Sequence, residues 1–133
     1  MGDVRSRGAG GEAPPLVLLL DLKDEPEAIA RYEAAHRPGG VPAAVLESIQ
    51  AAGISEMIIH RAGNRLVMLV EMAPGAELGA KAAADAANPD VVAWEARMDM
   101  LQQRLPFAQA SEKWVLAAPI FTLSEHARGR ACA

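Results

Sequence analysis

The sequence feature that most constrains the fold is a pair of apolar runs joined by a short turn. The runs occupy residues 57–60 and 66–72, and Gly63 with Asn64 lies between them. A Gly-Asn turn between two such runs is typical of a β-hairpin, because these residues readily adopt the backbone angles that a tight turn requires. The chain is therefore expected to contain an antiparallel sheet that includes this hairpin.

A strand and two helices are predicted before the hairpin. Residues 16–22 form a short, nearly continuous apolar run, which indicates a buried strand. Asp24 is expected to cap a helix that has Pro26 near its start. A second helix is predicted over residues 42–52, with Gly53 supplying the stop.

Two further helices and a last strand are predicted after the hairpin. An alanine-rich helix is expected over residues 78–87, and Asn88 is expected to cap a longer helix that ends near residues 105–106. Residues 114–116 and 120–123 suggest one last strand, interrupted by a proline. A proline within a strand fits an edge or a bulge better than a central position.

The resulting order, β-α-β-β-α-β, is the ferredoxin-like pattern of the α+β class: an antiparallel sheet with its helices on one face. It predicts a single domain over residues 16–124, between a flexible arm at 1–15 and a tail at 125–133. The apolar runs at 16–20 and 66–70 do not alternate cleanly with polar residues, so both sheet faces are expected to be covered. A homodimer with its sheets face to face, a dimeric α+β barrel, would cover them.

Charge and motif content exclude several classes of function. The net charge is −4 and no basic run is long enough to follow phosphates, so nucleic acid is not expected as a partner. The single cysteine, Cys132, cannot form an internal disulfide, which fits a cytoplasmic location. Residues 16–20 are far too few to span a membrane. The histidines lack metal-site spacing, and no nucleotide-binding glycine motif or nucleophilic-serine motif occurs, so neither a metal nor a cofactor is expected.

A tyrosine and a histidine one helical turn apart suggest chemistry. Tyr32 and His36 would project from the same face of one helix, which Pro38 ends. Together they can move protons on and off a bound ligand near neutral pH. On spacing alone a structural role is favoured, because a histidine in a last turn stabilises the helix dipole and a tyrosine there often packs on the core.

Five further residues are candidates for contact with a ligand. Arg37 follows the histidine directly, and His60 lies near a strand end, where a surface role is equally expected. Trp94 lies on an apolar helix stripe, where a core role is favoured, although aromatic faces also stack on sugar rings. Met57 favours filling a core gap, and Lys113 is equally compatible with an exposed charge pair.

A series of short segments, which includes all of these candidate residues except Met57 and His60, resembles the small sugar mutarotases of the L-rhamnose mutarotase family, especially its L-fucose mutarotase branch. The segments follow one another in order across almost the whole predicted domain. They are residues 20–24, 32–38, 48–54, 63–66, 83–89, 94–95, 102–103, 105–106, 112–115 and 120–121.

The resemblance implies a dimeric ferredoxin-like enzyme that interconverts the anomers of a sugar without a cofactor. It implies that His36 is the acid/base residue, that Tyr32 assists it, and that Trp94 lines the sugar pocket. The implied substrate is a monosaccharide, a 6-deoxy-L-hexose, with L-fucose favoured and L-rhamnose next. Met57, His60, Arg37 and Lys113 complete the expected set of substrate contacts.

Three positions depart from the aromatic residues common in such relatives. Val41 replaces a tryptophan, His60 replaces a pocket tyrosine, and Asp99 lies near the place of a further tryptophan. His60 is therefore expected to take an acid/base or hydroxyl-binding role. Two other functions fit the same scaffold. One is a non-catalytic sugar-binding or regulatory dimer, and the other is a dimeric α+β barrel oxygenase, although the sequence gives no haem or flavin signal.

Overall fold

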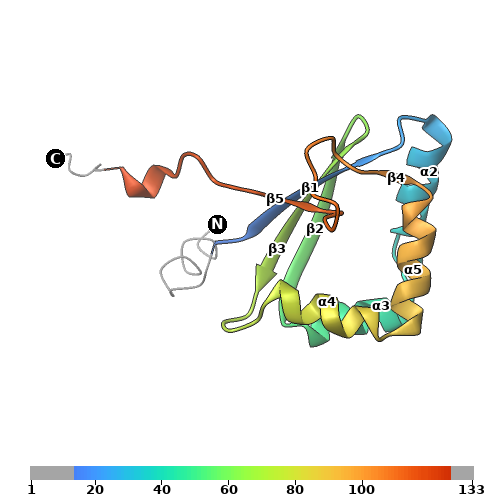
Figure 1. Cartoon of the computed structure of the whole chain (residues 1–133), viewed down its shortest axis with the longest axis horizontal. Coiled ribbons are helices and arrows are strands. Elements are labelled where there is room, and N and C mark those ends of the chain that lie inside the picture. The colour runs from blue at the N-terminus through green and yellow to red at the C-terminus, as the bar shows by residue number, and fades with distance from the viewer. Residues whose placement is uncertain (1–13, 127–133) are drawn as a thin grey trace.

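The computed structural model describes residues 14–126, and its elements follow the predicted order (Figure 1). The strands are β1 (Leu16–Leu22), β2 (Ile54–Ala62), β3 (Arg65–Met72), β4 (Gln102–Gln103) and β5 (Val115–Ala117). The helices are α2 (Pro26–Ala35), α3 (Ala43–Ala51), α4 (Leu78–Ala86), α5 (Pro89–Asp99) and the 3-10 turn η1 (Leu123–Glu125). Most of the predicted arm at 1–15 and of the tail at 125–133 lies outside the described residues.

The strands form one antiparallel sheet in which β1 is central. Strand β3 pairs along one edge of β1, and β2 lies outside β3. The other edge of β1 is shared: β4 pairs with Asp21 and Leu22, and β5 pairs with residues 17–19. The last strand of the ferredoxin-like pattern is thus split into two short pieces, and the predicted α+β class is confirmed.

All four α-helices lie on one side of the sheet (Figure 1). Helices α2 and α5 lie side by side along one end, while α3 and α4 run across the other, so the helices and the sheet form the sides of a triangle. The alternate residues Leu18, Leu20 and Leu22 of β1 face the helices and are buried. Leu22 packs with Val91 and Met98 of α5, and Leu18 packs in a second cluster with Val70 of β3, so the hydrophobic core lies within this triangle.

The predicted hairpin is confirmed. Gly63 has a positive φ of 60°, which glycine adopts at little cost, and Asn64 follows it in the turn. The turn is also tied to the central strand, because the Leu22 backbone N–H donates to the Asn64 carbonyl at 2.7 Å. The Asn64 side-chain amide donates in return to the Leu22 carbonyl at 3.1 Å.

The two helix caps predicted from sequence had different outcomes. Asn88 caps α5 as expected, because its side-chain oxygen accepts from the backbone N–H groups of Asp90 and Val91. The prediction for Asp24 was wrong: the N-cap of α2 is Glu25, and no side chain caps that helix. Pro26 at the first position removes one of the donors that a cap would satisfy.

The chain after α5 also differs from expectation. The helix ends at Asp99 and not near residues 105–106, because Met100 and Leu101 turn tightly and the Leu101 carbonyl accepts from the Lys23 N–H at 2.9 Å. This contact directs the chain back to the sheet, where it forms β4. The last strand was predicted too long, since Ile120 and Phe121 lie outside it and are exposed.

The sheet face opposite the helices carries mainly apolar side chains. Register places Ile58, Leu69 and Val17 in one row across this face, and Val67 and Leu19 in the next. No element of residues 14–126 covers it (Figure 1). The Asp21 carboxylate and the Arg65 guanidinium form a two-pronged ion pair at 2.6 and 3.2 Å at one end of the same face.

Candidate active site

A cavity of about 710 Å³ lies between the sheet and the helices. Its walls come from β1, β2, β3 and β4 on the sheet side and from all four α-helices. Most of the wall is apolar, and a few aromatic and polar side chains from distant parts of the sequence are gathered in it. They include Tyr32, His36, Trp94, Glu95, Gln102 and Trp114. A mostly apolar cavity with a few convergent polar groups is the usual form of a small-molecule site.

Tyr32 and His36 share one face of α2, as their spacing predicted. Their rings are 4.2 Å apart between centroids, and both line the cavity. His36 is the C-cap of the helix, after which the chain turns sharply. A Cβ on Gly40 would lie only 2.6 Å from the Ala35 carbonyl oxygen, so a glycine at this position lets the chain fold back against the helix end.

The helix backbone fixes which nitrogen of His36 carries the proton. Its Nδ1 lies 2.7 Å from the carbonyl oxygen of Tyr32. A carbonyl oxygen only accepts hydrogen bonds, so Nδ1 must be the donor, and the neutral ring keeps its free lone pair on Nε2. No residue within 14–126 hydrogen-bonds to Nε2, which makes it the basic atom of this ring.

Trp94 completes the aromatic cluster from α5. The His36 ring meets it edge-on, with centroids 5.3 Å apart. The guanidinium carbon of Arg97 lies 5.1 Å from the indole centroid, a cation–π contact one helical turn further along. Trp94 is buried in the core and also lines the cavity, so it holds the imidazole in place whether or not a ligand stacks on it.

Burial makes the Tyr32 hydroxyl a persistent donor. It raises the pKa of this phenol to about 12, and the negative charge of Glu95 adds to the rise, while the Gln102 amide opposes it. Tyr32 therefore keeps its proton across the neutral range. It can donate a hydrogen bond to a ligand, but it does not act as a base there.

Of the seven residues predicted for the site, four come together and three do not. Tyr32, His36, Trp94 and Met57 line the cavity. The other three, Arg37, His60 and Lys113, are not among its lining residues.

Each of these three has its own environment. Arg37 is exposed beyond the end of α2. His60 is also exposed and lies opposite Val67, on the sheet face that points away from the helices. The Lys113 ammonium contacts Glu95 at 2.5 Å and Asp99 at 2.7 Å, so its positive charge is paired with two carboxylates of α5.

The three positions without an expected aromatic side chain are also separated. Val41 lines the cavity, where it leaves more room than a tryptophan would. Asp99 pairs with Lys113 and does not line the cavity, and His60 lies on the open sheet face. Only the Val41 replacement therefore changes the cavity within one chain.

Sequence reasoning missed several polar residues in the cavity wall, among them Glu95 and Gln102. Glu95 follows Trp94 directly, and its negative charge acts on the Tyr32 phenol. Gln102 lies on β4, which was expected to be part of a helix. Both occur in segments that resemble the sugar mutarotases, but only the tertiary structure shows that their side chains reach one cavity.

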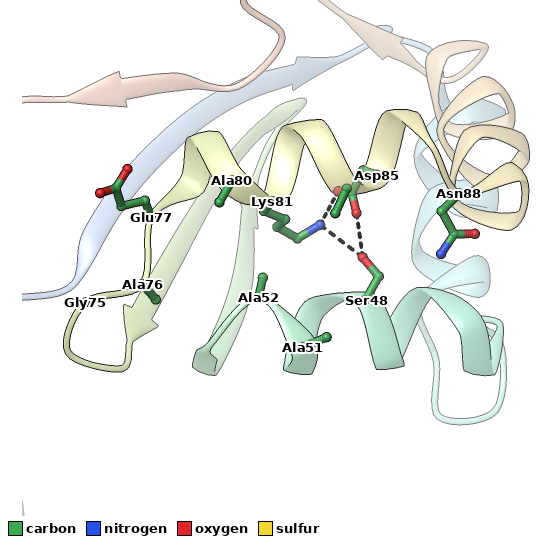
Figure 2. Close-up of a pocket in the computed structure, with 11 residues that line it drawn as sticks. Ser48, Ala51, Ala52, Gly75, Ala76, Glu77, Ala80, Lys81, Asp85 and Asn88 are labelled. Atoms are coloured by element: carbon green, nitrogen blue, oxygen red, sulfur yellow. Dashed lines mark hydrogen bonds and ion pairs between the residues drawn. The ribbon is translucent and has the colours of Figure 1, made fainter.

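A second hollow, of about 540 Å³, lies between α3 and α4 (Figure 2). Lys81 and Asp85 of α4 point toward Ser48 of α3, and the three side chains form a closed network. The Ser48 hydroxyl donates to Asp85 Oδ1 at 2.6 Å, and the Lys81 ammonium contacts Asp85 Oδ2 and lies 3.5 Å from Ser48 Oγ. The network ties the two helices together.

Residues 14–126 contain neither a cluster of metal-ligating side chains nor a helix that could span a membrane. Within that range, no group of three or more histidine, cysteine, aspartate or glutamate side chains is arranged to hold a metal ion. No helix in the described part of the chain is long and apolar enough to cross a membrane.

Comparison with known proteins gives two matches that agree. The family model described as L-rhamnose mutarotase matches residues 16–123, which is most of the chain. An L-fucose mutarotase from Xanthomonas campestris is 47% identical over 110 residues, covering 83% of this chain and 88% of the relative. The matched range includes every strand and helix described above except the end of η1. The chain belongs to the L-rhamnose mutarotase family.

Proposed function

We propose that the protein is a cofactor-independent mutarotase that interconverts the α and β anomers of a 6-deoxy-L-hexose, with L-fucose favoured and L-rhamnose next. The observation that carries the proposal is the position of His36. Its Nε2 is free, its ring is held between Tyr32 and Trp94, and it borders a cavity large enough for a monosaccharide. Family membership and the 47% identical L-fucose mutarotase support the same reaction.

Anomer exchange needs two proton movements. One proton leaves the anomeric hydroxyl while another reaches the ring oxygen, and the bond between C1 and the ring oxygen breaks to give the open aldehyde. Rotation about C1–C2 and closure on the other carbonyl face produce the second anomer. Every bond broken in opening is remade in closure, so no net oxidation or reduction occurs.

We assign the proton at the ring oxygen to His36 Nε2. Protonated, this nitrogen donates to the ring oxygen as the ring opens; neutral, it accepts the proton back as the ring closes. An imidazole suits both directions because it can both donate and accept a proton near neutral pH, and positioned acid/base groups give about 10²–10⁴-fold acceleration. Tyr32 hydrogen-bonds and orients the sugar as a neutral donor, while the anomeric proton exchanges with water in the open cavity.

The proposal is tested by exchange NMR on the anomeric protons of equilibrated L-fucose and L-rhamnose, with and without the protein. We expect magnetisation transfer between the anomers of L-fucose to become faster in proportion to protein concentration. Sugar binding without faster transfer for either sugar would contradict the enzyme and favour a non-catalytic sugar-binding dimer. Faster transfer for L-rhamnose alone would support the mutarotase reaction but identify L-rhamnose, and not L-fucose, as the substrate.

We also propose that the protein works as a homodimer whose sheets meet face to face. The support is the open sheet face, where Ile58 is 44% exposed and Val17, Leu19, Val67 and Leu69 are only half-buried. Large exposed apolar faces of this kind are usual at subunit interfaces. Sedimentation of wild type and of Ile58→Glu tests this, with the exposed α5 variant Val92→Glu as the matched control. A dimer lost only in Ile58→Glu is expected, and a monomeric wild type would contradict the assembly.

A further inference from the structure

Gln102 is a polar residue of the cavity that the proposed proton transfer does not use. It lies on β4, where it pairs with Leu22 of the central strand. Directly paired residues share a sheet face, and Leu22 faces the helices, so Gln102 also projects toward the cavity and lines it. Its neighbour Gln103 projects the opposite way and is exposed.

The amide of Gln102 is incompletely used in the free protein. The residue is 9% exposed, and its Oε1 is buried with no hydrogen-bond partner. Within residues 14–126 no other buried side-chain nitrogen or oxygen is left in this condition. Buried acceptors are almost always paired, because an unpaired one has lost its water without any replacement.

The surroundings narrow down what could pair with this oxygen. Tyr32 lies close enough for the Gln102 amide to influence its phenol, and Trp94 and Met98 of α5 line the same cavity. A donor that enters the cavity can pair with this oxygen. A sugar presents several hydroxyl donors at once, and the broad terminal torsion of glutamine lets the amide turn toward them.

We infer that Gln102 is a sugar-recognition residue, whose Oε1 accepts a hydrogen bond from a ring hydroxyl of the bound monosaccharide. The inference rests on the proposed function for the nature of the ligand, but it concerns binding and not proton transfer. Gln102 selects sugars that place a hydroxyl at this oxygen. A sugar without that hydroxyl leaves the acceptor unpaired and is bound less well.

Replacement of the amide separates this role from a structural one. Gln102→Met keeps a long unbranched side chain and removes the acceptor. Because the unpaired oxygen is then gone, we expect the melting temperature of the free protein to stay the same or rise. L-Fucose affinity should fall by about tenfold or more, the usual effect of losing one good hydrogen bond to a ligand. Gln103→Met, on the exposed face next to it, should change neither quantity.

Monodeoxy sugars give a second measurement, and its wild-type part does not depend on how the variant folds. The wild type should bind one monodeoxy L-fucose about tenfold more weakly than L-fucose, and Gln102→Met should bind these two sugars alike. Affinities are measured by NMR titration of the sugar signals. Equal wild-type affinity for every monodeoxy sugar would overturn the inference, as would wild-type L-fucose affinity in Gln102→Met.

These outcomes differ from failure of the proposed function. If the wild type binds L-fucose but does not speed its anomer exchange, the proposed mutarotase activity is contradicted. The recognition role of Gln102 can still be tested by the affinity measurements. If the wild type exchanges anomers and Gln102→Met binds L-fucose with the same affinity, only the recognition role of Gln102 is contradicted.

Discussion

The two hollows of this protein are built from similar materials but differ in how their polar groups are satisfied. In the hollow between α3 and α4, Ser48, Lys81 and Asp85 bond to one another (Figure 2). In the cavity under the sheet, His36 Nε2 and Gln102 Oε1 have no hydrogen-bond partner among residues 14–126. Closed networks stabilise a fold, whereas unused hydrogen-bonding capacity points to a ligand.

The difference explains why the smaller hollow is a poor candidate for chemistry. A lysine paired with a carboxylate in a part-buried network is held in one place and already neutralised. The imidazole, by contrast, is oriented by one nitrogen and left available at the other. The comparison predicts that substitutions of His36 and Gln102 change activity or sugar affinity, while substitution of Ser48, which lines only the smaller hollow, changes stability.

The largest expected effect comes from His36→Asn. The asparagine amide can still donate to the Tyr32 carbonyl, but no group replaces Nε2. Anomer exchange per folded molecule should fall by at least about 100-fold with little change in melting temperature. Exchange NMR and circular dichroism measure the two quantities, with His126→Asn, far along the C-terminal segment, as the histidine control. Full activity in His36→Asn would show that Nε2 is not needed for anomer exchange, and it would contradict the contrast drawn between the two hollows.

Alkaline titration tests the environment of Tyr32, the only tyrosine in the chain. Its phenolate absorbance should appear near pH 12 in the folded protein and near ~10 after unfolding. Since the unfolded state loses this proton first, Tyr32 should contribute full stability below about pH 10 and lose it as the pH rises toward 12.

The size of that alkaline effect can be isolated with Tyr32→Phe. Two pKa units correspond to roughly 2–3 kcal/mol, so the wild type should lose about that much more unfolding free energy than Tyr32→Phe between pH 10 and 12. Denaturant unfolding at several pH values measures it. Parallel losses in both proteins would mean that the phenol is not buried in solution. Near neutral pH, Tyr32→Phe should slow anomer exchange by about tenfold, through loss of one hydrogen bond.

Asn88→Ala tests the N-cap of α5, the helix that carries Trp94, and leaves the side chains of the cavity wall unchanged. The variant removes the two cap hydrogen bonds of α5, at 3.1 and 3.4 Å, and should lower the unfolding free energy by about 1 kcal/mol. Exchange measured at a temperature where the variant is fully folded should stay within about twofold of wild type, because the cap touches neither His36 nor Gln102. A large fall in activity without a loss of stability would contradict this separation.

Ser48→Ala tests the hollow between α3 and α4, and its expected effect is the smallest. It removes a hydroxyl that donates to Asp85 at 2.6 Å, and stability should fall by about 0.5–1.5 kcal/mol. Anomer exchange by the folded protein should be unchanged. A substantial loss of exchange would show that the α3–α4 network serves the reaction after all.

The sequence was most informative where local chemistry decides the structure. The Gly63-Asn64 turn, the Asn88 cap and the shared helix face of Tyr32 and His36 each follow from residues within one or two turns of one another. Their prediction needed no knowledge of the rest of the fold, and the fold class followed from the order of such elements.

Prediction failed where a distant contact overrides the local pattern. The apolar stripe of α5 continues beyond Asp99, but a hydrogen bond from Lys23 to the Leu101 carbonyl draws the chain into the sheet. The same change of direction buries Gln102, so its position in the cavity wall could not be predicted from hydrophobic periodicity. The substrate contact expected for Lys113 stays a prediction: its ammonium pairs with two carboxylates of α5, and it does not line the cavity of one chain.

The hydrogen bond between His36 and the Tyr32 carbonyl has a consequence for how such a site diversifies. The carbonyl belongs to the backbone, so it survives any substitution of the side chains around the pocket. Under the proposed function, acid/base competence is carried by one turn of α2, while hydroxyl recognition is carried by side chains such as Gln102 on another element. Sugar preference is then free to drift during evolution while the proton-transfer machinery stays intact.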